Sequence, residues 1–83
     1  MSRAEDVLEK KLRTLTGRAI REAREGKGLS QGELADEAKL DRTYISMLEN
    51  GRKNTSLFVF IRVCRALGQQ PSVVLHGIEV SIR

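Results

Sequence analysis

The sequence of 83 residues is long enough for one small domain and too short for two. A domain of this size has little core, so helical packing or dimerisation has to supply its stability. Lys and Arg outnumber Asp and Glu by 15 to 11, which gives a formal net charge of +4. A basic domain attracts phosphate through counterion release, although this charge is also ordinary for a small protein.

The isolated titratable side chains argue against a metal or redox site. Cys64 is the one cysteine, so no disulfide framework or zinc site can form within one chain, and we expect a small buried hydrophobe. His76 is the one histidine, and we expect an exposed side chain. The charged N-terminus lacks the apolar segment of a signal peptide, and no apolar run is long enough to span a bilayer. We therefore expect a cytoplasmic protein with no membrane contact, metal or cofactor.

The first predicted helix covers residues 6–26. Apolar side chains recur along it at spacings of three or four, with Ile20 beside them: Leu8, Leu12, Leu15, Ala19 and Ala23. The sequence GKG at 26–28 ends the pattern. Thr and Gly are poor helix formers, so Thr14, Thr16 and Gly17 leave open whether one helix runs through or a second starts near residue 16.

Two short helices follow, over residues 31–38 and 42–49. Ser30 and Glu33 have the spacing of a capping box, in which each side chain satisfies a backbone N–H of the helix start. Asp41 is a favourable N-cap residue for the second helix. Its apolar residues Ile45 and Leu48 face inward, and Gly51 ends it.

The C-terminal third predicts two further helices and a tail. Ser56 can cap a fourth helix that runs to about Leu67, with Gly68 after its end. Its predicted inward face consists of Leu57, Phe60, Ile61, Cys64 and Leu67. Pro71 suits the first turn of a short fifth helix over 71–76. Beyond it, alternating apolar residues at 78, 80 and 82 have a strand period, so we expect the tail to be either frayed or paired with some other segment.

Three fragments, in this order and spacing, read GRAIREAREGKGLSQGELA, LDRTYISMLENGRKN and SLFVFIRVCRALG. Together they resemble the helix-turn-helix of the Cro and phage-repressor (XRE-type) family over residues 16–75. The resemblance implies an all-α, five-helix lambda-repressor-like DNA-binding domain over 16–76. Residues 1–15 would be an N-terminal helical extension and 77–83 a short C-terminal tail. LDRTYIS and ENGRKN look most like the controller proteins of restriction-modification systems.

The resemblance assigns base reading to the outer face of the helix over 42–49, which would enter the major groove of double-stranded DNA. The residues expected to read bases are Arg42, Thr43, Ser46 and Met47. An Arg can pair with guanine O6 and N7, worth about 1–3 kcal/mol of discrimination, although Arg42 can also contact a phosphate. Met47 is also a candidate for partial burial in the core.

A second group of residues would hold the DNA backbone, which positions a protein without reading sequence. The resemblance places Gln31, Tyr44, Arg52, Lys53 and Asn54 in this group. For Tyr44 the alternative is packing of the ring against the preceding helix. Arg24 and Glu49 match a structural ion pair that ties the first helix to the recognition helix, so neither is assigned to DNA.

The fourth helix is apolar nearly all round, where the family usually has polar residues at positions 58 and 59. Such a helix is buried on more than one side. The N-terminal extension, the tail or a second subunit could cover it, and we favour a homodimer. A two-fold dimer would place its recognition helices about one DNA turn apart. The predicted interface consists of Phe58, Val59, Arg62, Val63, Val74, Ile78 and Val80.

These observations predict a non-enzymatic, sequence-specific transcriptional regulator that binds a palindromic operator as a dimer. We find no nucleophile–base set, paired catalytic carboxylates, phosphate-binding Gly loop or small-molecule effector site in the sequence. The alternative is a protein-interaction module with the same fold, such as an antitoxin or a partner-binding subunit. Whether the regulator activates or represses depends on operator position, which the protein sequence does not record.

Overall fold

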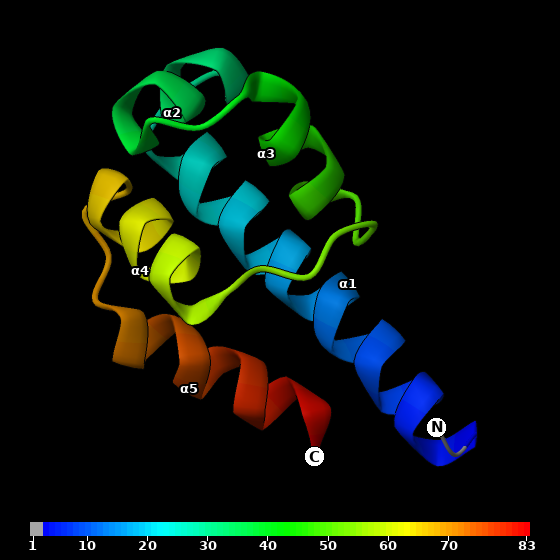
Figure 1. Cartoon of the computed structure of the whole chain (residues 1–83). Helices are drawn as coiled ribbons and strands as arrows, with labels where there is room; N and C mark the ends of the chain where they lie inside the picture. Colours follow the sequence, from blue (N-terminus) through cyan, green and yellow to red (C-terminus); the bar gives the residue numbers. More distant parts are fainter. Residues whose placement is uncertain (1–2) are drawn as a thin grey trace.

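The computed structural model describes residues 3–83, and this part of the chain contains five helices and no strand (Figure 1). The helices are α1 (Arg3–Gly26), α2 (Gln31–Ala38), α3 (Arg42–Glu49), α4 (Leu57–Ala66) and α5 (Pro71–Ile82). The predicted all-α class with five helices is confirmed. The long α1 runs through the molecule, and its N-terminal turns extend beyond the other helices.

The helix α1 is continuous through the position where the sequence left a break open. Gly17 lies in its middle and is buried. A Cβ atom built on Gly17 would lie 2.3 Å from the carbonyl oxygen of Leu48 and 2.7 Å from that of Glu49. The glycine is therefore needed for the close approach of α1 to the end of α3, and the helix accepts its low helix propensity, about 1 kcal/mol relative to Ala.

The capping predictions are confirmed at two helices and wrong in part at a third. At α2, the Glu33 N–H donates to Ser30 Oγ (3.0 Å) and the Ser30 N–H donates to Glu33 Oε1 (2.9 Å). The bond from the Ser30 backbone lowers the pKa of Glu33. At α4, Ser56 Oγ accepts from the Val59 N–H (3.1 Å). Asp41 occupies the N-cap position of α3, but its side chain makes no capping hydrogen bond.

The core lies where α1, α2, α3 and α4 meet. Its buried side chains are Ile20, Leu34, Ala35, Ala38, Ile45, Leu48, Val63 and Leu67. The prediction that Leu57 and Ile61 face inward is wrong, because they are 69% and 37% exposed. The inward face of α4 is Phe60, Val63, Cys64 and Leu67. Cys64 is a buried hydrophobe as predicted, and burial raises the pKa of its thiol to about 11.

The predicted strand at the C-terminus is wrong, because α5 continues to Ile82 and lies beside α1 and α4 (Figure 1). Ile78 and Ile82 are four residues apart, a spacing that both a strand and a helix place on one face. Ile78 is buried and Ile82 is partly buried. Ser81 Oγ donates to the Gly77 carbonyl (2.9 Å), and Glu79 pairs with Arg83 one turn later.

No helix of residues 3–83 has both the length and the apolar character needed to cross a membrane. Within the same residues, no three His, Cys, Asp or Glu side chains are grouped as they would be to hold a metal ion.

Candidate nucleic-acid interface

The connection between α2 and α3 has a fixed geometry. Lys39 ends α2 in the left-handed conformation (φ 58°), which is uncommon for a residue with a side chain. Arg62 of α4 donates to the carbonyl oxygens of Ala38 (2.5 Å) and Lys39 (2.9 Å), so a cation closes the C-terminal end of α2. Arg62, which was also predicted as an interface residue, is partly buried, and its guanidinium carbon lies 5.4 Å from the centroid of the Phe58 ring.

Helix α3 divides into an inner and an outer face. Ile45 and Leu48 are fully buried against the core. Arg42 and Thr43 at the start of the helix are exposed, whereas Ser46 and Met47 are partly buried. Positions 42, 43 and 46 form a strip along the outer face, since residues four apart share a face. The structure thus brings the predicted base-reading residues together on one outer strip, with Met47 at its inner edge.

Two predicted backbone contacts, Gln31 and Tyr44, lie on the helix pair itself. The Gln31 side-chain N–H donates to Glu49 Oε1 (3.1 Å), so α3 fixes the orientation of this side chain at the N-terminus of α2. The Tyr44 ring is partly buried against the core, and Lys53 Nζ lies 5.8 Å from its centroid.

The loop after α3 carries the other three predicted backbone contacts. Arg52, Lys53 and Asn54 are all exposed. The Asn54 side chain, however, reaches back to α1, where Nδ2 donates to Glu9 Oε1 (2.8 Å). The sequence did not indicate this contact, which joins residues 45 positions apart.

Glu49 links three helices through one carboxylate whose side chain is fully buried. Arg24 binds it through two hydrogen bonds, Nε to Oε2 (2.6 Å) and Nη2 to Oε1 (2.9 Å), which confirms the predicted ion pair. Arg21 adds a longer contact from Nε to Oε1 (3.4 Å). Arg21 was missed, although it lies three residues before Arg24 on the same face of α1. We name this set, Arg21, Arg24, Gln31 and Glu49, the carboxylate hub.

The hub holds Glu49 in its charged form. Burial by itself would raise the pKa of Glu49, but hydrogen bonds from Arg24, Gln31 and Arg21, together with the Arg24 charge, hold it below the ordinary value. The hydrogen bond with Glu49 in turn raises the pKa of Arg24 further. The C-terminal end of α3 is therefore fixed to α1 and α2 by a paired charge.

The predicted interface between subunits is only partly exposed. Val63 (0% exposed) and Ile78 (6%) belong to the interior, so their assignment to an interface is wrong. Val59 and Val74 are partly buried, while Phe58 and Val80 are exposed.

Other apolar side chains, beyond those predicted for the interface, are exposed. Leu57 and Leu75 line one hollow, and Leu75 and Leu12 line the next. These three residues form what we call the apolar face. The sequence held one signal for the α1 part of this face. Leu8 and Leu12 are apolar and four residues apart, although both precede residue 16, where the predicted domain begins.

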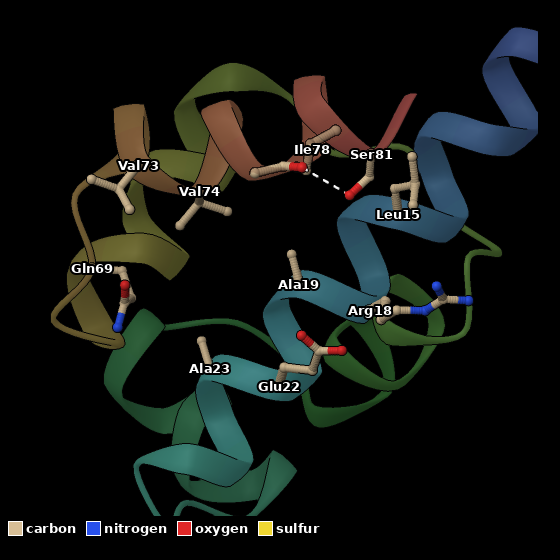
Figure 2. A pocket seen from close by; sticks show the side chains of 11 residues that line it. Leu15, Arg18, Ala19, Glu22, Ala23, Gln69, Val73, Val74, Ile78 and Ser81 are labelled. Atoms are coloured by element: carbon tan, nitrogen blue, oxygen red, sulfur yellow. Dashed lines mark hydrogen bonds between the residues drawn. The ribbon is translucent and has the colours of Figure 1, made fainter. Parts of the chain in front are cut away.

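A groove lies between α1 and α5 (Figure 2). Helical spacing puts its α1 residues Ala19 and Ala23 on the opposite face of the helix from Arg21 and Arg24 of the carboxylate hub. Ala19 and Ala23 leave room in its floor, and Arg18, Glu22 and Gln69 line it with polar groups. None of the predicted DNA contacts lies there, so the groove is separate from the candidate nucleic-acid interface.

A family model described as helix-turn-helix matches residues 20–74. The control protein C.BamHI of Bacillus amyloliquefaciens is 43% identical over 65 residues, covering 77% of this chain and 80% of that protein. The clp gene regulator ClgR of C. glutamicum has a TM-score of 0.80 at 38% identity, covering 87% of this chain and 94% of that one.

A third relative has been solved with DNA. The restriction-modification controller protein C.Esp1396I, as a tetramer in complex with its natural 35-base-pair operator, has a TM-score of 0.78 at 28% identity, over 86% of this chain and 93% of that one. The match to the family model spans α2 and α3 with their supporting helices, and the relatives are regulators of the same fold. The chain therefore belongs to the helix-turn-helix family of DNA-binding transcription regulators, of the XRE type that its motifs indicate.

Proposed function

We propose that this protein is a cytoplasmic, homodimeric regulator that recognises a palindromic operator by inserting α3 into the major groove. The observation that carries the proposal is the outer strip of exposed Arg42 and Thr43 and partly buried Ser46, on a helix whose opposite side is buried. Base reading needs a helix held at a fixed angle. The carboxylate hub and the Arg62 cap supply that support from α1, α2 and α4.

In this proposal each residue of the outer strip of α3 has a separate role. Arg42 pairs with a guanine edge in the groove, which contributes about 1–3 kcal/mol of discrimination. Thr43 offers a hydroxyl to a base edge or a methyl group to thymine. Ser46 is small and lets the helix approach the bases closely.

Contacts to the DNA backbone would come from both sides of α3. Gln31 lies in the first turn of α2, where free N–H groups and the helix dipole favour a phosphate. Arg52 and Lys53 lie beyond the other end of α3 and are exposed. Such contacts set the register and orientation of the helix without reading sequence.

The second subunit would cover the apolar face. Leu57 and Leu75 are 69% and 47% exposed and belong to α4 and α5, away from α3. Exposed apolar side chains that adjoin in this way mark interaction sites in small soluble proteins. A two-fold axis there would leave both α3 helices free for successive turns of DNA.

The proposal is tested by selecting a preferred duplex from random DNA and measuring its dissociation constant beside that of a random duplex. A specific regulator binds the selected duplex at least about a thousandfold more tightly, and its affinity falls steeply with salt. Equal affinity for the two duplexes at physiological salt would refute the proposal.

The alternative, a protein-interaction module, is favoured by one observation, the amount of exposed apolar surface on α1, α4 and α5. Sedimentation of the purified chain separates the two. A stable homodimer that binds DNA alone supports the regulator. A monomer that aggregates unless co-expressed with another protein supports the module.

A further inference from the structure

One face of α1 contacts the C-terminal end of α3 and then the loop that follows it. Arg24 and Arg21 contact Glu49, and Gly17 meets the carbonyl groups of Leu48 and Glu49. Nearer the N-terminus, the contacts of α1 move to residues 51 and 54. The two segments therefore run antiparallel, with α1 supporting the loop as well as the helix.

The N-terminal part of this series consists of three hydrogen bonds. Arg13 Nε donates to the Gly51 carbonyl (3.1 Å), and its Nη1 donates to Glu9 Oε1 (2.7 Å). Asn54 Nδ2 donates to the same Glu9 oxygen (2.8 Å). Gly51 has a positive φ of 71°, and a Cβ atom there would lie 3.3 Å from Thr14 Cα. The loop is thus held at its backbone and at a side chain.

We propose that Glu9, Arg13 and Asn54 form a loop anchor that positions Arg52 and Lys53 for the DNA backbone. The inference rests on the proposed function. It changes the role of Asn54 from a phosphate contact to a positioning residue, because its side-chain amide is bound to α1. The family match begins at residue 20, so Glu9 and Arg13 lie outside it, on the N-terminal half of α1.

The physical reason is the cost of ordering a loop on binding. A loop fixed beforehand does not lose this freedom when it meets DNA, so affinity rises without a new contact. Glu9 itself is negative, so by charge alone it repels phosphate and its removal would strengthen DNA binding. If Glu9 positions the loop, its removal weakens DNA binding instead.

The test compares Glu9→Ala with Glu22→Ala in the full chain. Both variants remove one negative charge from α1, but Glu22 lies in the groove beside α5 (Figure 2) and makes no part of the anchor. The measurement is the dissociation constant for the selected operator duplex. We expect Glu9→Ala to weaken binding roughly three- to tenfold, the effect of one positioned hydrogen bond. Glu22→Ala should bind as well as the parent or slightly better.

A double-mutant cycle tests whether Glu9 and Asn54 act as a pair. Asn54→Ala should weaken binding about as much as Glu9→Ala, and the double variant no more than either. Binding by Glu9→Ala that equals or exceeds that of Glu22→Ala, or additive losses in the double variant, would overturn the anchor.

A measurement without DNA separates failure of the anchor from failure of the proposed function. The Gly51 and Arg52 N–H groups donate to the carbonyls of Leu48 and Met47. Their hydrogen exchange should be faster in Glu9→Ala and in Asn54→Ala, and unchanged in Glu22→Ala. Unchanged exchange in all three variants overturns the anchor, even if the parent protein binds no duplex and the proposed function fails. Thermal unfolding of each variant checks that it is folded.

Discussion

The contact between α1 and α3 is completed by groups of this one chain, whereas the apolar face is left exposed. The first is closed: Gly17 lets the two backbones meet, and the buried Glu49 carboxylate has partners on α1 and α2. The second is open, since Leu57 and Leu75 are exposed on α4 and α5. The closed contact fixes the angle of the recognition helix within one subunit. The spacing between the recognition helices of two subunits would instead be set by how a second subunit packs on the exposed apolar face.

The largest effect is expected where the backbones of α1 and α3 meet. In Gly17→Ala the new Cβ atom would overlap backbone atoms of Leu48 and Glu49, which cannot rotate away. We predict a loss of about 4 kcal/mol or more, a large part of the stability of a small domain. Thermal and urea unfolding measure it.

Gly77→Ala is the matched control, because nothing lies within 4 Å of a Cβ atom at that position of α5. There the substitution should stabilise the helix by about 0.5–1 kcal/mol. Equal effects of the two substitutions would mean that α1 and α3 do not approach as closely as described.

Removing the buried charge should have the next largest effect. Glu49→Gln leaves Arg24 without its ionic partner in a largely buried site. We predict a loss of about 3 kcal/mol in the free energy of unfolding. Glu25→Gln, on the exposed side of α1, should change it by less than about 0.5 kcal/mol. A similar small change in Glu49→Gln would show that the carboxylate hub does not hold α3.

A substitution on the apolar face should weaken dimerisation and leave the stability of the folded subunit unchanged. Leu57→Glu places a charge on this face but at the first position of α4, where a negative charge favours the helix dipole. We predict little change in the unfolding of the isolated subunit and a roughly hundredfold weaker dimer, about 2 to 3 kcal/mol. Sedimentation measures the dimer constant.

Gln69→Glu is the control for Leu57→Glu, since it adds the same charge in the groove between α1 and α5. An unchanged dimer in Leu57→Glu, or equal weakening in both variants, would move the interface away from the apolar face.

The pH dependence of unfolding should also report the buried carboxylate. The pKa of Glu49 is lower in the folded chain than its ordinary value of 4.5. Its stabilising contribution is therefore complete above about pH 4.5 and is lost as the pH falls through the lower, folded value. The slope from this one group reaches at most about 1.4 kcal/mol per pH unit. Urea unfolding between pH 6 and 3 should show a smaller slope in Glu49→Gln, and an unchanged slope would contradict the assignment.

Features set by neighbouring residues were predictable from the sequence. Ser30 and Glu33 cap α2 because three residues separate a helix cap from its partner, whatever the rest of the fold. The inward positions Ile45 and Leu48 follow from helical spacing. The Arg24–Glu49 pair was predicted through the resemblance, since no local rule joins residues 25 positions apart.

Features set by packing between distant segments were not predictable. Leu57 was expected inside, but the placement of α4 leaves it exposed. Ile78 and Ile82 fit a strand as well as a helix, because a spacing of four satisfies both periods. The contact of Asn54 with Glu9 depends on how far α1 extends, which the sequence left open.

The most direct test of recognition by α3 compares Arg42→Ala with Lys53→Ala on the selected and random duplexes. If α3 reads bases, Arg42→Ala loses about 1–3 kcal/mol on the selected duplex and much less on the random one, so its preference shrinks. Lys53→Ala should weaken both duplexes alike and reduce the salt slope by about one. An Arg42→Ala variant that weakens both duplexes equally would contradict base reading by this helix.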